Sequence, residues 1–592
     1  MTTGESLPRG ETIIKDDITI MVGGQGGDGT LTVVNLFSRV FRTVGLNVYD
    51  SRNVLSRIRG GHADGLIRAS MREIYNVGDS IDILVAFERE ALKVGLEYLR
   101  PDGLIIYDTS RSELPDTNDM KKYHILTAPF GRISADNLRR ELFKNTVTFG
   151  LLGRILGFDA DLLRQVVRDR YLRRGEEALQ KNSQALDFGF KLFDERVHSP
   201  MYMMRHGNNK GKIVLSGNDA VGYGFLVAGG RFFVGYPITP ASDIMEWLQK
   251  ILPRFGGVVR QAEDELSVIN MAIGAAFAGA RTMISTSGPG MSLTTEGVGQ
   301  AGGAEIPLVI VDCQRAGPTT GMPTKMEQSD LYHVVFGGHG DYPRLVLAPS
   351  TVEECFYMTI DACNLAEKYQ LPVFLILDQA IAQNNSTVNE FDLSRVHIDR
   401  ENMLTQKELE QIDVYRRYQF TDNGVSPRTV PGMKDGMHLV TGNEHDEFGH
   451  VSTDRKNRTL MMQKRMKKVE TARKELPTPK IIGEPSAKTG FIAYGSPYGA
   501  ILEAVEHLSQ EAVKTKFLQL RTLWPLHETE ISNFIDSCDT VYVVEHNVSG
   551  QLSSLIKLAC VKHNLKGIRK FDGTPFRPYD IVSPVLSGGE RT

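Results

Sequence analysis

The sequence predicts an α/β protein with three α/β domains, and three observations support this prediction. The chain has 592 residues, which is too long for one core when a domain takes about 150 residues. Short apolar runs alternate with longer segments of helical periodicity, a pattern typical of parallel strands joined by helices. Two polar stretches interrupt this alternation and divide the chain into three parts.

Composition excludes several classes of protein. Hydrophobic residues make up 41% of the chain and charged residues 24%, and the net charge is −4, so nothing indicates a nucleic-acid-binding face. No apolar run approaches the roughly 18 residues that a membrane span needs, and residues 1–17 lack a signal-peptide core. The five cysteines are scattered without a CxxC pair. We therefore expect a cytoplasmic protein without structural disulfides, and without a local iron–sulfur site.

The composition shifts also give expected domain boundaries. These are an N-terminal domain at 1–200, a linker at 201–211, a doubly wound domain at 212–388, a polar insertion at 389–482 and a C-terminal domain at 483–592.

The N-terminal domain begins with a possible phosphate-binding loop. A strand at 18–22 is followed by a glycine-rich segment, 23–29, and by a helix expected over 31–44. Glycines in such a loop let backbone N–H groups approach an anion at the helix N-terminus. The candidates are Gly23, Gly24, Gly26 and Gly27. Alternatively, Gly27-Asp28-Gly29 with Asn53 is a weak match to a Mg²⁺-binding GDG…N loop.

A cationic loop and a basic helix follow. Arg57 and Arg59 lie beside a glycine pair, where they either bind phosphates in bidentate fashion or sit on a solvated hairpin. Apolar runs at 83–87 and 104–107 indicate buried parallel strands, and an Arg/Lys-rich helix is expected over 162–191.

The doubly wound domain contains six apolar runs that we interpret as strands: KIVLSG, RFFVGY, RTMIST, LVIVDC, RLVLAP and PVFLILD. Between them, the YPITP turn at 236–240 precedes a helix that we expect Ser242 or Asp243 to cap. Glu265 opens a further helix, rich in Ala and Gly, and a TSGPG turn starts at Thr286.

A long Gly/Pro-rich loop, 312–330, leaves the carboxyl end of a predicted strand, where open α/β sheets bind ligands. It carries Arg315 and Lys325, which makes it a candidate for binding a carboxylate substrate. The alternative is that Lys325 is an ordinary surface lysine.

The polar insertion contains Glu444-His445-Asp446-Glu447, but its HxxxxH spacing fits no common zinc site. We predict no metal there. The basic run 464–468 is interpreted as one face of a solvated helix, with docking of an acidic partner as the alternative.

These motifs together resemble one family. YPITPASD, the acidic EDE at 263–265 and TSGPG resemble the alpha-chain pyrimidine-binding domain of 2-oxoacid:ferredoxin oxidoreductases. GGQGGDG and RIRGGHADGLIRAS resemble that family's gamma domain, while YGSPYGAILEA, LRTLWPL and VVEHNVSGQL resemble a transketolase C-terminal-like domain. GNEHDE recurs in the family's alpha chains of the 2-oxoglutarate type.

The resemblance implies an activity and roles for particular residues. A 2-oxoacid, favoured here as 2-oxoglutarate, would react reversibly with CoA and ferredoxin to give acyl-CoA, CO₂ and reduced ferredoxin. Glu265, with Glu263 as fallback, would hydrogen-bond the pyrimidine of thiamine diphosphate. Thr239 would contact the substrate, Lys325 and Arg315 its carboxylate, and the glycine loop with Arg57 and Arg59 the CoA phosphates.

The resemblance also implies partners. A beta subunit would supply the Mg²⁺–diphosphate loop and a [4Fe–4S] cluster, in an expected α₂β₂ heterotetramer that reduces ferredoxin.

Other substrates and functions stay open. The substrate could instead be pyruvate, a branched-chain 2-oxoacid or indolepyruvate. The chain could also be a CoA- or nucleotide-binding structural chain, or an ATP-dependent ligase. The direction of the reaction, decarboxylation or CO₂ fixation, stays open.

Overall fold

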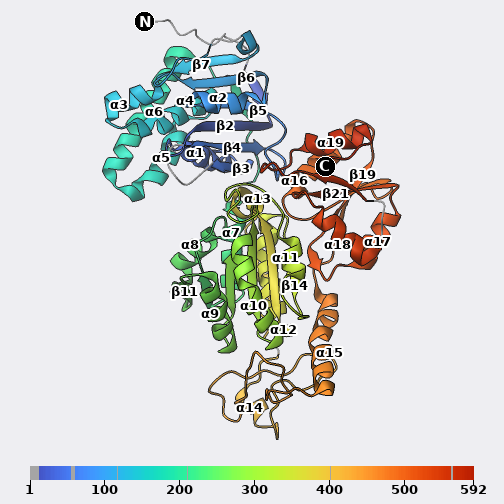
Figure 1. Ribbon diagram of the computed structural model, residues 1–592. Helices are drawn as coiled ribbons and strands as arrows, with labels where there is room; N and C mark the ends of the chain where they lie inside the picture. Colours follow the sequence, from blue (N-terminus) through green and yellow to red (C-terminus); the bar gives the residue numbers. More distant parts are fainter. Residues whose placement is uncertain are drawn as a thin grey trace. The chain divides into compact units, whose positions relative to one another are not determined.

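A computed structural model describes residues 12–54, 61–115, 118–209, 211–400, 402–561 and 565–591 (Figure 1). The chain forms two compact units. The first holds residues 1–215 with 384–390, and the second holds 216–383 with 391–592. Among the described residues, no helix combines the length and the apolar content that crossing a bilayer requires.

The first unit is built on an eight-stranded mixed sheet of order β7-β6-β5-β2-β4-β3-β16-β9. Its strands are β2 (Asp17–Gln25), β3 (Asn47–Val54), β4 (His62–Ser70), β5 (Ile81–Ala86), β6 (Leu99–Asp108), β7 (His124–Ala128), β9 (Ile213–Ser216) and β16 (Asn385–Val388). The parallel strands predicted at 83–87 and 104–107 are present, while β4 runs antiparallel to both β2 and β3. The KIVLSG strand, expected in the second sheet, is β9 at the edge of this one.

Six helices accompany this sheet: α1 (Thr30–Thr43), α2 (Arg89–Leu96), α3 (Phe130–Leu138), α4 (Lys144–Ile155), α5 (Ala160–Tyr171) and α6 (Glu176–Arg196). The basic helix predicted over 162–191 is therefore two helices, because Gly175 adopts φ 102° between them. Helix α4 packs tightly on α6, since a Cβ on Gly189 would lie 2.3 Å from the Val147 carbonyl oxygen. A short parallel pair, β1 (Ile13–Lys15) with β8 (Tyr202–Met204), joins distant parts of the unit.

The second unit contains a seven-stranded sheet of order β11-β10-β12-β13-β15-β14-β20. Its strands are β10 (Phe232–Gly235), β11 (Val258–Gln261), β12 (Thr282–Thr286), β13 (Leu308–Gln314), β14 (Leu345–Leu347), β15 (Pro372–Asp378) and the antiparallel β20 (Thr522–Trp524). The helices are α7 (Gly217–Val227), α8 (Ser242–Ile251), α9 (Glu265–Phe277), α10 (Gly288–Gly303), α11 (Leu331–Phe336), α12 (Val352–Tyr369) and α13 (Gln379–Gln383).

The strand order marks where a ligand is expected. From β10 the chain passes to β11 on one side and then to β12 on the other, so the winding direction reverses beside β10. In doubly wound sheets, ligands bind at the carboxyl ends of the strands at such a reversal. The YPITP turn follows β10 and the TSGPG turn follows β12, so both lie at this place.

A smaller five-stranded sheet of order β17-β19-β18-β21-β22 belongs to the same unit. Its elements are β17 (Lys480–Gly483), β18 (Thr489–Ala493), β19 (Thr515–Gln519), β21 (Thr540–Glu545), β22 (Leu565–Arg569), α16 (Pro497–Gln510), α17 (Glu528–Asp536), α18 (Gln551–Cys560) and α19 (Pro578–Ser587). The α/β fold class predicted from the sequence is confirmed.

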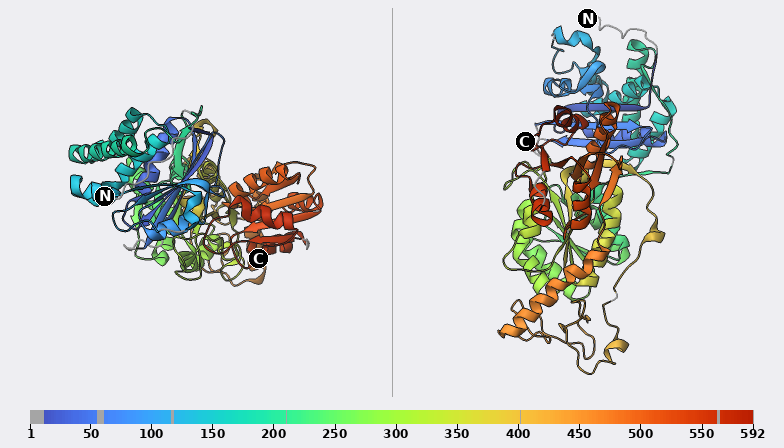
Figure 2. Two further views of the ribbon diagram at one scale, coloured as in Figure 1. Left: turned by 90° about the horizontal axis from the view of Figure 1, so that it is seen from above. Right: turned by 90° about the vertical axis from the view of Figure 1, so that its right-hand side faces the viewer.

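The insertion is mostly irregular, with a short α14 (Gln406–Leu409) and the long α15 (Arg455–Ala472), drawn in orange beside these loops in Figure 2. The interpretation of residues 464–468 as a solvated face was wrong. Lys464 and Lys468 are buried and pair with the buried carboxylate of Glu305, 2.5 Å from the Lys464 Nζ. A partner so distant in sequence is invisible in the local pattern.

Candidate active site

The predicted site residues of the second unit come from loops at the carboxyl ends of adjacent parallel strands. Gly235 of β10 is in register with Ser285 of β12, and Thr286 is in register with Asp312 of β13. The turns that follow these strands therefore meet at one edge of the sheet.

Glu265 is the first residue of α9, and Asp264 caps this helix by accepting a hydrogen bond from the Ser267 N–H at 2.7 Å. Glu265 is only 5% exposed, whereas Glu263 lies on the surface. Among the described residues, the Glu265 carboxylate has no hydrogen-bond or ion-pair partner. The acidic EDE segment thus provides a cap, an exposed residue and one buried carboxylate that is available to another group.

The first turn of α10 closes over this carboxylate. A Cβ on Gly290 would come within 2.6 Å of Glu265 Oε1 and 2.0 Å of Thr286 Oγ1. Only glycine lets the TSGPG turn approach so closely, which explains its place in the predicted motif.

Arg315 and Thr239 are brought together. The Arg315 Nη1 donates to the Thr239 carbonyl oxygen at 2.6 Å, and its Nη2 donates to the Thr320 carbonyl oxygen at 3.3 Å. Arg315 is 7% exposed, and burial lowers the pKa of its guanidinium although the negative charge of Asp330 opposes this shift. Arg315 therefore ties the YPITP turn to the long loop after β13. The expected cap of α8 was wrong: the helix begins at Ser242, but no side chain caps it.

The long loop folds back on itself and places Lys325 near the end of β13. The Ala316 N–H donates to the Lys325 carbonyl oxygen at 3.1 Å, and the Met322 N–H donates to the Ala316 carbonyl oxygen at 2.9 Å. The half-buried Lys325 side chain also faces Gly573, where an added Cβ would be 3.1 Å from it. The C-terminal sheet region thus supports the loop that carries the candidate substrate lysine.

Two further carboxyl groups at this edge were not predicted. Asp312 is fully buried, and neither of its carboxyl oxygens has a hydrogen-bond partner among the described residues. Burial, and then the neighbouring Asp330, raise the pKa of Asp312 well above its usual value. Burial also raises the pKa of Asp330 to about 7, and its Oδ1 lies 2.6 Å from where a Cβ on Gly288 would be. A lone aspartate at the end of a strand carries no sequence signal that would have revealed this pair.

A buried glutamine joins the two sheets of the second unit beside the site. The Gln328 Nε2 donates to Asp378 Oδ2 at 2.9 Å and to the Tyr494 carbonyl oxygen at 3.1 Å. Its backbone N–H donates to the His546 carbonyl oxygen at 2.7 Å, and the Asn547 Nδ2 donates back to the Gln328 carbonyl oxygen at 3.0 Å. The sequence analysis predicted residues 312–330 only as a substrate loop and gave no role to Gln328.

The glycine-rich loop of the first unit already contains a carboxylate. Gly23 and Gly24 belong to β2, and the backbone N–H of Gln25 donates to Asp28 Oδ2 at 3.0 Å. Lys144 and Arg111 pair with Asp28 Oδ1 at 3.0 and 3.2 Å. The predicted strand–loop–helix is present, but the Asp28 carboxylate of the loop itself takes up the donors and cations around it. Arg57 and Arg59 lie outside the described residues.

The insertion motif forms structural pairs. Arg465 Nη2 donates to Glu444 Oε2 at 2.7 Å, and Arg458 pairs with the same oxygen. Burial alone would raise the pKa of Glu444, but these two arginines hold it at about 2. The Asp446 carboxylate accepts the N–H groups of its own turn, from Phe448 and His450.

Comparison with known proteins defines the class. Three family models match: "Pyruvate ferredoxin/flavodoxin oxidoreductase" over 19–192, "Pyruvate flavodoxin/ferredoxin oxidoreductase, thiamine diP-bdg" over 223–464, and "Pyruvate:ferredoxin oxidoreductase core domain II" over 487–581. The middle of the chain is therefore a thiamine-diphosphate-binding domain of an oxidoreductase.

The relatives identify the family. A 2-oxoacid:ferredoxin oxidoreductase subunit alpha from Sulfolobus sp is 33% identical over 96% of this chain and 97% of its own length. The 2-oxoglutarate synthase subunit KorA of Methanothermobacter thermautotrophicus is 34% identical over 63% of this chain and 97% of its own length. A structure of 2-oxoglutarate:ferredoxin oxidoreductase from Magnetococcus marinus, with 2-oxoglutarate, coenzyme A and succinyl-CoA bound, matches at TM-score 0.90 and 33% identity, covering 97% of this chain and 99% of that one. The chain belongs to the 2-oxoacid:ferredoxin oxidoreductase alpha subunits, which confirms the resemblance seen in the sequence.

Proposed function

We propose that the enzyme containing this alpha subunit acts on 2-oxoglutarate and converts it with CoA to succinyl-CoA and CO₂ while ferredoxin accepts the electron pair. Relatives named 2-oxoglutarate synthase and a similar enzyme crystallised with 2-oxoglutarate support this substrate. The same residues would serve the reverse reaction, which fixes CO₂.

The buried Glu265 carboxylate is the observation that carries the proposal. It lacks a partner among the described residues and lies under the glycine turn of α10, so it can accept a hydrogen bond from a flat ring placed against it. When bound, thiamine diphosphate supplies a nucleophilic carbon that adds to the substrate carbonyl and takes up the electrons released by decarboxylation. Glu265 would hydrogen-bond N1′ of the aminopyrimidine, which favours the imino tautomer of the ring, the form that can take up a proton.

Three neighbours would hold the substrate. Arg315 fixes the Thr239 turn through its hydrogen bond to the Thr239 carbonyl oxygen, and Thr239 would contact the substrate from this turn. Lys325, on the folded loop, would pair with a substrate carboxylate as a point charge. Because the Arg315 Nη atoms already bind carbonyl oxygens, its contribution to substrate binding would be secondary.

The remaining components would come from outside these residues. A beta subunit would supply the Mg²⁺–diphosphate loop and the [4Fe–4S] cluster, with an α₂β₂ assembly reducing ferredoxin in the cytoplasm. The first unit would bind CoA.

Copurifying the chain with its partner and measuring CoA-dependent viologen reduction tests the proposal. Each of 2-oxoglutarate, pyruvate and a branched-chain 2-oxoacid is offered separately with thiamine diphosphate. We expect the highest kcat/KM with 2-oxoglutarate. Turnover with only another oxoacid would reject the substrate and keep the chemistry. No turnover from a complex with bound thiamine diphosphate and an intact cluster would reject the function.

A further inference from the structure

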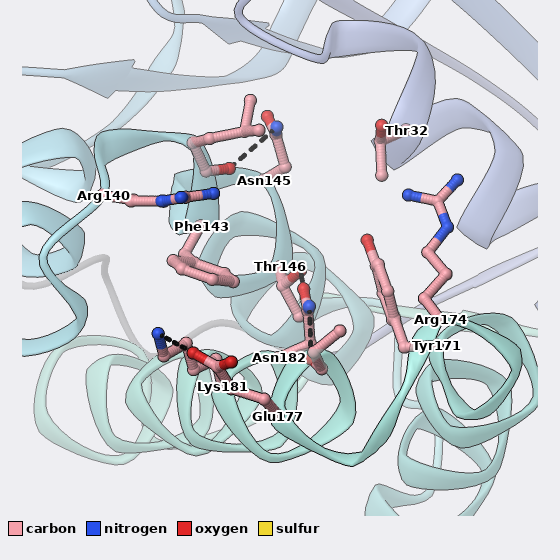
Figure 3. Close-up of a pocket in the computed structure, with 12 residues that line it drawn as sticks. Thr32, Arg140, Phe143, Asn145, Thr146, Tyr171, Arg174, Glu177, Lys181 and Asn182 are labelled. Atoms are coloured by element: carbon pink, nitrogen blue, oxygen red, sulfur yellow. Dashed lines mark hydrogen bonds and ion pairs between the residues drawn. The ribbon is translucent and has the colours of Figure 1, made fainter.

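The first unit contains a pocket that the residues discussed so far do not use. Its volume is about 390 Å³, within the usual range for a small-molecule site. It lies between the starts of α1 and α4 and one face of α6 (Figure 3). Its lining consists of Thr32, Arg140, Leu142, Phe143, Asn145, Thr146, Tyr171, Arg174, Glu177, Ala178, Lys181 and Asn182.

The pocket is cationic. Arg140, Arg174 and Lys181 line it against the single carboxylate of Glu177, which pairs with Lys181 at 2.6 Å. Arg140 and Arg174 form no ion pair among the described residues, and Figure 3 shows them on opposite sides of the hollow. The two guanidinium groups have no carboxylate partner in the described part of the chain, although that of Arg174 lies 5.8 Å from the centre of the Tyr171 ring. They favour a ligand with at least one phosphate, which guanidinium binds in bidentate fashion.

The floor of the pocket is polar and buried. Asn145 is 3% exposed; its Nδ2 donates to the Leu142 carbonyl oxygen at 3.0 Å, while its Oδ1 has no hydrogen-bond partner among the described residues. Beside it, the Thr146 Oγ1 donates to Asn182 Oδ1 at 2.7 Å. The Asn145 Oδ1 is itself covered by protein, so the polar character of this wall comes from the Thr146 and Asn182 side chains.

The walls can hold a flat ring. Phe143 and Tyr171 present aromatic surface, and Leu142 and Ala178 add aliphatic surface. A ligand that combines a flat heterocycle, polar ring substituents and phosphate is a nucleotide.

We propose that this pocket is a nucleotide-binding site, with its phosphate between Arg140 and Arg174 and its base against Phe143 and Tyr171. Two sources share this chemistry: the adenosine bisphosphate end of CoA, and a free adenine nucleotide. If the ligand is CoA, the proposal rests on the CoA-binding role proposed above for the first unit. If the ligand is a free nucleotide, it does not.

Calorimetric titration of the copurified holoenzyme with adenosine 3′,5′-bisphosphate tests the site. We expect one site per chain, weakened about tenfold by Arg140→Ala and by Arg174→Ala, since each removes one charged hydrogen-bonding partner. Both arginines are exposed, so neither truncation should affect folding. Ala178→Phe, which fills the pocket from α6, should abolish binding.

The matched control is Arg39→Ala, which removes an exposed arginine of the same unit outside the pocket and should change binding less than twofold. Displacement of the bisphosphate by CoA would identify CoA as the source. Binding of ADP without displacement by CoA would identify a free nucleotide. No saturable binding below about 1 mM, or equal weakening by Arg39→Ala, would overturn the site. CoA-dependent turnover in that case would leave the proposed function intact.

Discussion

Two buried glutamates of the second unit, Glu265 and Glu305, differ in whether the protein itself supplies a partner for the carboxylate. Glu305 is fully buried, and both its oxygens contact ammonium groups, with the Lys464 Nζ at 2.5 and 2.7 Å. Although burial alone would raise the pKa of Glu305, Lys464, Lys468 and Arg417 hold it well below its usual range. Glu265 is almost as buried and has no partner among the described residues.

Buried carboxylates with and without partners have different roles in this unit. A buried charge with its partners in place fixes the packing of two segments, here the turn that follows α10 and the helix α15, and has nothing left to offer a ligand. A buried charge without partners persists only if something else compensates for its burial or uses it. Variants of these residues test whether this division holds.

Glu265→Gln should lower kcat by about 10²- to 10⁴-fold, because the amide cannot hold the ring proton in place. The melting temperature should stay within a few degrees, since no protein contact is lost. Viologen reduction and circular dichroism measure the two effects. Glu263→Gln, on the surface, is the matched control and should retain activity. Equal losses in both variants would remove the distinction between the two glutamates.

Glu305→Gln should show the opposite pattern, a loss of about 3–5 kcal/mol in the free energy of unfolding, because two buried ammonium groups lose their counter-ion. Chemical denaturation measures it. Replacing Glu305, Lys464 and Lys468 together with apolar residues of similar volume should restore most of the loss. If the triple variant is as unstable as the single one, the cluster does not act as an ion pair.

Gly290→Ala should affect both properties. Its Cβ would lie 2.6 Å from Glu265 Oε1, so the carboxylate or the turn must move, at about 1–3 kcal/mol in stability. Activity should fall together with stability. Gly303→Ala, at the end of the same helix with no atom within 4 Å of the added Cβ, should be neutral or slightly stabilising.

Asp330 is a third buried carboxyl group of this unit, and its contribution to the stability of the fold depends on pH. Burial raises its pKa from 3.8 to about 7, so the folded state binds a proton more tightly than the unfolded chain does. Its contribution to stability is fully present below pH 4 and is lost as the pH rises through about 7. Asp330→Asn should therefore become progressively more stable relative to wild type as the pH rises from about 4 to about 7, as measured by denaturation at each pH. A constant difference would contradict the raised pKa.

The sequence allowed the α/β class, the parallel strands β10, β12, β13, β14 and β15 and the start of α9 at Glu265 to be predicted, because apolar periodicity and helix-start chemistry are local. It could not choose between Glu263 and Glu265, which only burial distinguishes. The interpretation of Lys464 and Lys468 as solvent-exposed was wrong because their partner, Glu305, lies 159 residues before Lys464 in the sequence. Asp312 and Asp330 were missed for a similar reason: their environment is made by strands and turns that come together only in the fold.

The edge strand β20 has a consequence for synthesis of the chain. It pairs with β14 through Val346–Trp524 and Leu347–Thr522, so the seven-stranded sheet stays incomplete until residues 522–524 have been made. At about 5–20 residues per second, the ribosome needs roughly 10–35 s to pass from β14 to β20. During that interval β14 presents an unpaired edge, which is a template for pairing with other chains. How much of the protein reaches the folded state would therefore depend on whether a chaperone covers this nascent edge during synthesis.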